Sequence, residues 1–258
     1  MRLQLDASLG REYKSASQWA RRVTEGWAKE NLYCLACPSG SLSAHVANRA
    51  VEDFYCPACA RRIQLKSKNG RIGATVSNSA YTKKVTAILA GRAPDYYFLS
   101  YDKGELRVDE LLCVPGHFLT LSVISKRRPL KATARRAGWI GSNIHLDLLP
   151  ARGKIPLVID GRVVPVKETR RQFRELEFVK ELPVERRGWL MDVLACLDTI
   201  GLRRGSSFAN ADVYGCEDWL LTLHPQNKNI RPKIRQQLQV LASYGQVERV
   251  SPGVYRRL

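Results

Sequence analysis

Three polar residues in the first third of the chain have the types and the spacing of a phosphodiester-cleaving centre. Asp53 precedes Gln64 and Lys66, which are separated by one residue. In a β-strand, residues two apart share a face, so Gln64 and Lys66 project together while Ile63 and Leu65 point to the opposite, apolar side. If the segment around Asp53 pairs with this strand, oxygen donors for magnesium and a lysine that orients or deprotonates the attacking water meet at one end of a sheet.

The spacing of these three residues is by itself a weak motif, and a solvated, charged strand end explains it better in isolation. Gln64 adds a physical difficulty, because its amide oxygen can bind a hard cation but contributes no charge, whereas magnesium prefers carboxylates. Glu52, beside Asp53, and Glu25, in a predicted helix, are candidate auxiliary acids. Glu25 is equally well explained as an exposed helical acid.

Four cysteines form two Cys-x-x-Cys pairs, Cys34 with Cys37 and Cys56 with Cys59, separated by eighteen residues. Each pair can aim two sulfurs at one tetrahedral ion, and four thiolates leave no open position, so the spacing predicts a structural zinc site. The alternatives are two unrelated pairs or a redox motif. The second pair would form the turn of the hairpin that brings Asp53 to its partners. The remaining cysteines lie in apolar contexts and are predicted to be small core residues: Cys113, Cys196 and Cys216.

The composition points to a polyanionic partner. The 258 residues include 42 Lys and Arg against 24 Asp and Glu, a net charge of +18, which favours nucleic acid first and an anionic membrane second. The start of the chain lacks an apolar signal-peptide core, and no eighteen apolar residues run together, so we expect no membrane partner. We therefore expect a cytoplasmic protein in a reducing compartment, long enough for two domains and monomeric in solution.

The pattern of apolar residues predicts a mixed α/β (α+β) first domain. Residues 15–30 have the periodicity of an amphipathic helix with Ala20, Val23 and Trp27 on one face. Strands are predicted at 50–55, 63–67, 96–101, 107–114 and 155–160, separated by turn-forming segments.

The pattern changes near residue 180, which divides the chain into domains 1–182 and 183–258. RGWLMDVLACLDTIG predicts a helix, FANADVYGCEDWLLTLHP a second short helical segment, and IRPKIRQQLQVLASYG a third helix. QVERVSPGVYRRL predicts two strands around a Ser-Pro-Gly turn. Three helices closed by a hairpin indicate a winged helix, whose last helix usually enters the major groove of DNA.

The third helix of this domain has an apolar stripe of Ile230, Ile234, Leu238 and Leu241. The residues that this stripe leaves outside can bind guanine edges, adenine edges and phosphates. A merely solvated helix face is the alternative. The candidate DNA-binding residues are Arg231, Lys233, Arg235, Gln236 and Gln239.

Extended segments of the chain carry a family resemblance. The strings EYKSASQWARRVTEGWA, VEDFYCPAC, LKSKNG, RRPLKATARRAGWIGSNI and IRQQLQVL, in this order, closely resemble DpnI-type methyl-directed type II restriction endonucleases of prokaryotes. The resemblance implies a restriction-endonuclease-like PD-(D/E)xK core with an embedded four-cysteine zinc site, followed by a winged helix. It implies cleavage of duplex GATC that carries N6-methyladenine, giving a 5′-phosphate, a 3′-hydroxyl and blunt ends.

The resemblance also assigns roles to single residues. Asp53 matches the magnesium-binding aspartate, Lys66 the catalytic lysine, and the four cysteines the zinc ligands. Leu65 stands where the main-chain carbonyl often joins the metal shell, and Gln64 stands where the family has a glutamate.

A reader of N6-methyladenine should offer apolar or aromatic surface to the methyl group, as proteins do for the thymine methyl. Trp139 is the candidate, because it lies in a glycine-containing segment and follows Arg135 and Arg136. A core anchor is the alternative role for this tryptophan, and the resemblance favours DNA.

Three hypotheses remain open. The leading one is a magnesium-dependent, methylation-directed endonuclease with two DNA-reading modules. The second, motivated by Gln64, is a protein that binds methylated GATC without cutting it. The third is a zinc-ribbon transcription factor with a winged helix, which leaves residues 60–180 without a role.

Overall fold

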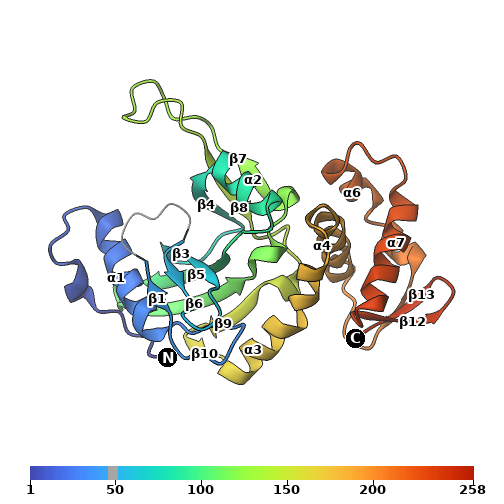
Figure 1. Ribbon diagram of the computed structural model, residues 1–258, viewed down its shortest axis with the longest axis horizontal. Coiled ribbons are helices and arrows are strands. Elements are labelled where there is room, and N and C mark those ends of the chain that lie inside the picture. The colour runs from blue at the N-terminus through green and yellow to red at the C-terminus, as the bar shows by residue number, and fades with distance from the viewer. Residues whose placement is uncertain (46–51) are drawn as a thin grey trace.

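The computed structural model describes residues 1–45 and 52–258 (Figure 1). Within these residues, the larger part of the chain is built on a seven-stranded mixed sheet with the order β1-β2-β3-β5-β6-β9-β10. Strands β3 and β5 are parallel, whereas β2 with β3 and β5 with β6 are antiparallel. The strands are β1 (Ser43–Ala44), β2 (Phe54–Tyr55), β3 (Arg62–Asn69), β5 (Asp95–Asp102), β6 (Arg107–Val114), β9 (Ile155–Ile159) and β10 (Arg162–Val163).

Strand β5 lies at the centre of this sheet, and its residues 96–99 form a continuous aromatic and aliphatic run. All of its residues except Asp102 are buried, as expected for a strand covered on both faces. Helix α1 (Ala16–Asn31) packs against β3, and helix α3 (Val166–Glu175) packs against β9. The amphipathic first helix and the strands predicted at 63–67, 96–101, 107–114 and 155–160 are thereby confirmed. The strand predicted at 50–55 lies partly outside the described residues, and its described part contains β2.

A second sheet, of three strands, was not predicted from the sequence. Its order is β4-β8-β7, with β4 (Thr75–Ala80), β8 (Gly141–His145) and β7 (Ile124–Lys126) all antiparallel to their neighbours. Helix α2 (Tyr81–Leu89) follows β4 directly. The loop between β7 and β8 projects away from the body of the molecule (Figure 1). Short 3-10 helices connect other elements: η1 (Ala7–Gly10), η2 (Gly116–Phe118), η3 (Leu121–Val123), η4 (Ala151–Gly153) and η5 (Glu177–Glu181).

The C-terminal part has the three helices and terminal hairpin that the sequence predicts, with additional detail. The stretch expected to be one short helical segment is a strand, β11 (Ser207–Ala209), followed by two helices, α5 (Asn210–Tyr214) and α6 (Glu217–Leu223). Strand β11 pairs with the second strand of the hairpin, giving the sheet order β11-β13-β12. The other elements are α4 (Val184–Thr199), α7 (Ile230–Ser243), β12 (Val247–Ser251) and β13 (Val254–Arg257).

Helix α4 is buried around most of its circumference from residue 190 to residue 197, rather than on one stripe. The reason is its position between the two parts of the chain, since it packs against α7 on one side and against α2 and η2 on the other. Asp192, 1% exposed, joins these surfaces: Ser122 donates a hydrogen bond to it over 3.1 Å, and its other oxygen lies 2.7 Å from Nε2 of His224. The helix therefore belongs to both packing interfaces.

Candidate functional site

Strands β2 and β3 form the hairpin that the sequence analysis required. Phe54 pairs with Ile63 and Tyr55 with Arg62, and the main-chain N–H of Asp53 donates to the carbonyl of Ile63 over 2.9 Å. The turn between the strands contains the second cysteine pair. The hairpin therefore carries Asp53 back to the strand that contains Gln64 and Lys66.

The carboxylate of Asp53 is fixed on this strand. Its Oδ2 atom accepts a hydrogen bond of 2.9 Å from the main-chain N–H of Leu65, the residue between Gln64 and Lys66. This contact aligns an acceptor-only group with the middle of the predicted motif. Asp53 is half-buried.

The ammonium group of Lys66 lies in the electrostatic field of Asp53. Burial lowers the pKa of Lys66, and nearby Arg21 lowers it further, whereas the carboxylates of Asp53 and Glu25 raise it. Glu25, the candidate auxiliary acid, is bound to Arg21 over 2.7 Å. Helix α1 holds this pair beside the strand, because Thr24 donates a hydrogen bond of 3.0 Å to the hydroxyl of Ser67.

Gln64 is buried, and its amide oxygen contacts a lysine that the sequence analysis missed. Nζ of Lys84, in α2, donates to Oε1 of Gln64 over 3.4 Å and lies 4.3 Å from the ring centroid of Tyr96. Burial lowers the pKa of Lys84 to about 7; Lys66 adds to this shift, and Asp53 opposes it. The available signal was helical periodicity, because Lys84 shares the buried face of α2 with Ile88, four residues later.

This centre offers oxygen donors but little negative charge. Asp53 supplies a carboxylate and Gln64 an amide oxygen, both of the hard-donor type that magnesium accepts. Two lysines, Lys66 and Lys84, lie close enough to influence each other's charge. The donors therefore fit a magnesium ion by type, while the surrounding charge weakens its binding.

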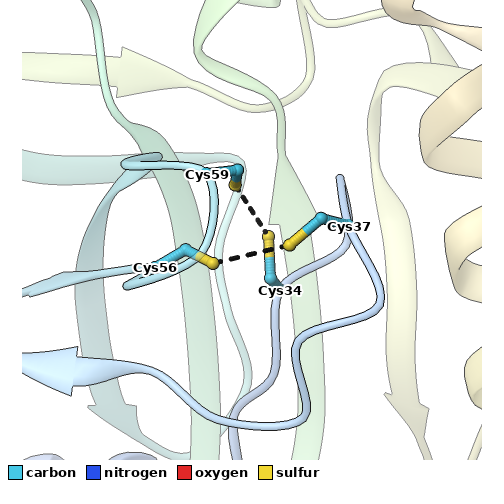
Figure 2. A group of neighbouring side chains, drawn as sticks. All are labelled: Cys34, Cys37, Cys56 and Cys59. Carbon is cyan, nitrogen blue, oxygen red and sulfur yellow. Dashed lines mark hydrogen bonds between the residues drawn. The ribbon is translucent and has the colours of Figure 1, made fainter.

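The four predicted zinc ligands come together in a cluster (Figure 2). Cys34 and Cys37 approach from the loop after α1, and Cys56 and Cys59 from the hairpin turn, with all four sulfurs pointing inward. Their Sγ atoms all lie within 4.8 Å of one another, and the pairs Cys34–Cys59 and Cys37–Cys56 are 3.6 and 3.5 Å apart. A tetrahedral ion with Zn–S bonds of about 2.3 Å separates its sulfurs by about 3.8 Å. The cluster could therefore hold a metal such as zinc.

Main-chain groups stabilise the ionised form of one cysteine in this cluster. Burial raises the pKa of Cys34 and opposes ionisation of Cys56, but main-chain N–H groups of Cys59 and Ala58 and neighbouring thiols lower the pKa of Cys56 to about 6. The turn is anchored by a hydrogen bond of 2.9 Å from the N–H of Ala60 to the carbonyl of Cys56. These contacts favour a thiolate at Cys56 at neutral pH, the form that binds metal, whereas burial raises the pKa of Cys34 and Cys59.

Helix α3 and the strand after the hairpin turn hold the cysteine cluster in place. Arg170 donates to the carbonyls of Cys34 and Ser39 over 3.0 and 2.8 Å. Arg61, directly after the turn, binds Glu177 over 2.6 Å and the buried carboxylate of Asp95 over 3.2 Å. The hairpin that carries Asp53 is therefore anchored beside its turn by acids from two other segments, while Arg170 holds the loop of the first cysteine pair.

The candidate methyl reader, Trp139, lies in the projecting loop between β7 and β8. Two hydrogen bonds of 3.0 Å close the loop, from Leu130 to the carbonyl of Trp139 and from Gly138 to the carbonyl of Leu130. Trp139 is half-buried, and the guanidinium of Arg136 lies 5.0 Å from its ring centroid. Arg135 and Arg136 are exposed. The loop thus presents a ring and two cations away from the core.

The predicted stripe of α7 is confirmed, because Ile230, Ile234, Leu238 and Leu241 are buried. Of the outward residues, Arg231, Arg235, Gln236 and Gln239 are exposed and Lys233 is half-buried. Several of them contact neighbours of the same domain. Arg231 binds Glu217 over 2.7 Å, Arg235 donates to the hydroxyl of Tyr214 over 2.8 Å, and Lys233 donates to Gln236 over 2.8 Å.

Family models match the two parts of the chain separately. The DpnI model, described as the Dam-replacing family, matches residues 1–182. The chain belongs to this Dam-replacing family. A second DpnI model, described as the Dam-replacing HTH domain, matches residues 185–257 of this Dam-replacing protein. The resemblance inferred from the sequence and the mixed α/β fold with a C-terminal helix-turn-helix domain are thus confirmed.

Membership in the Dam-replacing family supports a methyl-dependent restriction enzyme that acts on DNA, and the helix-turn-helix domain implies a DNA partner. Across residues 1–45 and 52–258, no helix combines the length and apolar character needed to cross a bilayer.

Proposed function

We propose that this Dam-replacing protein is a type II restriction endonuclease with a PD-(D/E)xK centre. It hydrolyses phosphodiester bonds of duplex DNA at GATC sites that carry N6-methyladenine. The observation that carries the proposal is the hairpin β2–β3, which brings Asp53 onto the strand of Gln64 and Lys66 through the contact with Leu65. Membership in a family of methyl-dependent DNA enzymes supports the same assignment.

The chemistry divides among the chain's own residues. Asp53, the amide oxygen of Gln64 and the main-chain carbonyl of Leu65 would hold the magnesium ion. When bound, magnesium supplies Lewis acidity at the scissile phosphate. The Leu65 N–H keeps the Asp53 carboxylate in position, and the Lys66 ammonium, near that carboxylate, orients the attacking water. The products are a 5′-phosphate and a 3′-hydroxyl at a blunt end.

The four cysteines have a structural role in this proposal. Cys34, Cys37, Cys56 and Cys59 bind zinc, and a site filled by four thiolates leaves no position for water or substrate. Zinc would lock the turn of the hairpin and so keep Asp53 in register with Lys66. This explains why a metal site occurs inside the motif, between its first and second members.

The DNA is read by two modules, divided in this proposal at residues 182 and 183. The β7–β8 loop brings Trp139 to the adenine methyl group, with Arg135 and Arg136 on the phosphates. The last helix of the winged helix, α7, enters the major groove with its outward-facing residues. Those residues are Arg231, Lys233, Arg235, Gln236 and Gln239.

The contact between Gln64 and Lys84 favours a second candidate function. It leaves one carboxylate, Asp53, as the charged ligand of the centre and adds a buried cation. A centre with one carboxylate and a neighbouring buried amine suits a protein that binds methylated GATC without cleaving it. The DNA-reading modules would be the same in both cases.

Cleavage assays on matched plasmids test the proposal. The zinc-loaded protein is incubated, with and without added magnesium, with plasmids that do or do not carry adenine methylation at GATC. We expect cuts only in methylated plasmid with magnesium, and none with the Lys66→Ala variant. Methyl-specific binding without cleavage would support the second candidate, and methyl-blind binding without cleavage would support a zinc-ribbon transcription factor.

A further inference from the structure

Lys84 places a buried amine, which is a cation when protonated, inside the candidate nuclease centre. Its side chain reaches the centre from α2, and the residue is 1% exposed. The groups that face it are the amide oxygen of Gln64, 3.4 Å from Nζ, and the ring of Tyr96, 4.3 Å from Nζ at its centroid. Lys66 and Asp53 lie within electrostatic range. Among the residues that the structure describes, no carboxylate forms a salt bridge with Lys84.

The two neighbours of this lysine are uncharged groups, which can bind a cation but cannot neutralise it. An amide oxygen and an aromatic face both attract an ammonium group through partial charges alone. Burial of a charged amine without an ionised partner is costly, and these two contacts offset part of that cost for the protonated form. The same amide oxygen is the position at which the family pattern has a metal-binding carboxylate.

An ammonium group and a divalent metal ion cannot both use this oxygen without strong repulsion. The two cations would lie within a few ångströms of each other in a site from which water is largely excluded, where Coulomb repulsion is poorly screened. Either the metal binds elsewhere around Asp53 or Lys84 withdraws from Gln64. The replacement of an acid by glutamine and the presence of Lys84 therefore act on the same property, the affinity of the centre for metal.

We propose that Lys84 is a resident cation that competes with the divalent metal for the amide oxygen of Gln64, so that these two residues together set the metal affinity of the centre. The inference rests on the proposed function in one respect, the binding of magnesium by Asp53 and Gln64. Lys84 is a positioning residue in this scheme, since it acts through Gln64 and contacts no substrate.

Substitutions of Gln64 and Lys84 should therefore have non-additive effects on metal affinity. Gln64→Glu alone gives a carboxylate that forms an ion pair with Lys84, so little of its charge is available to the metal. Lys84→Met alone removes the competing cation while keeping an unbranched side chain. The double variant has both a free carboxylate and no competitor, and coupling of this kind is expected between residues in contact.

Calorimetric titration of magnesium and manganese into the zinc-loaded proteins measures the metal affinity of each variant. We expect Lys84→Met to bind either metal about tenfold more tightly than the unsubstituted protein, and the double variant to exceed either single variant by at least about tenfold. Gln64→Glu alone should change the affinity by less than about threefold. Lys83→Met, on the exposed side of the same helix, is the matched control for loss of one positive charge.

Circular dichroism and zinc content verify that each variant is folded, and Lys84→Gln serves as a second variant that removes the charge but keeps a polar contact with Gln64. Metal affinities of Lys84→Met and Lys84→Gln equal to those of Lys83→Met would overturn the inference while leaving the proposed nuclease intact. The expected order of affinities without cleavage by any variant would overturn the nuclease and leave the inference standing. Absence of metal binding in all proteins, including the double variant, would overturn both.

Discussion

The carboxylate of Asp53 accepts a hydrogen bond of 2.9 Å from the main-chain N–H of Leu65, so the first residue of the candidate motif is fixed to the strand that carries the other two. The β2–β3 hairpin therefore sets the position of the Asp53 carboxylate relative to Gln64 and Lys66. The contact with Leu65 also separates two roles of Asp53, since an amide oxygen could replace the carboxylate as acceptor but not as an anion.

The Asp53→Asn variant should therefore keep the fold and lose the activity. We expect an unchanged melting temperature, because asparagine can still accept from Leu65, and cleavage of methylated plasmid reduced by at least about a hundredfold, since metal stabilises the transition state by several kcal/mol. Initial rates of plasmid cleavage measure the effect. The control is Asp147→Asn, at an exposed acid outside the hairpin. An undiminished rate in Asp53→Asn would remove Asp53 from the centre.

Substitution of one clustered cysteine should release the structural metal. In Cys37→Ser the zinc content, measured by elemental mass spectrometry, should fall well below one ion per chain, because a hydroxyl is a poor ligand for zinc. Loss of the ion should lower the free energy of unfolding by at least about 3 kcal/mol. Cys216→Ala, at a buried cysteine outside the cluster, should keep its zinc. Equal zinc content in both variants would contradict the four-cysteine site.

Acidification should destabilise the protein through His117. Burial lowers the pKa of this histidine to about 3, and Arg61 contributes to the shift, whereas the hydrogen bond with the carbonyl of Leu176 opposes it. Below pH 6.5 the unfolded chain binds a proton at this position and the folded chain does not, so stability decreases as the pH falls from 6.5 towards 3. The contribution is about 1.4 kcal/mol per pH unit.

Denaturant unfolding at several pH values, with His117→Gln as the comparison, isolates this contribution. The glutamine variant does not titrate here, so its stability should fall less steeply over the same interval. His145→Gln, on β8 in the second sheet, is the control for removal of a histidine. Parallel pH profiles for His117→Gln and the unsubstituted protein would exclude His117 as the cause.

Trp139 should distinguish methylated from unmethylated DNA. We expect Trp139→Ala to weaken binding of a methylated GATC duplex by about tenfold, in line with the contribution of one base–aromatic contact, and to affect the unmethylated duplex less. Fluorescence anisotropy with the two duplexes gives both affinities, and Trp139→Phe should retain part of the discrimination. If both duplexes lost affinity equally, Trp139 would be a general DNA contact rather than a methyl reader.

The parts of the molecule that were predictable from sequence depend on short-range patterns. The two cysteine pairs and the hairpin between Asp53 and Lys66 follow from spacing, because a tight turn fixes the distance between its ends. Strands β5, β6 and β9 follow from apolar runs that only a buried sheet accommodates. The stripe of α7 follows from helical periodicity in the same way.

The parts that were missed depend on contacts between distant segments. Lys84 belongs to the centre only because α2 packs where Gln64 of β3 and Tyr96 of β5 can reach its ammonium group. The second sheet joins β4 to β8 across more than sixty residues, with strands too short to show a strong pattern. Asp192 is buried because α4 lies between both parts of the chain.

The outward face of α7 should bind DNA mainly through charge. Each lysine or arginine that neutralises a phosphate releases a counterion, and its removal reduces the slope of log affinity against log salt by about 0.9. Arg235→Ala should show this reduction, although Arg235 must first exchange its hydrogen bond with Tyr214 for one with phosphate. Arg171→Ala, on α3 and paired with Glu168, is the matched control. A base-reading role would appear differently, as a loss of preference for GATC with an unchanged salt slope, and would assign Arg235 to a guanine instead of the backbone.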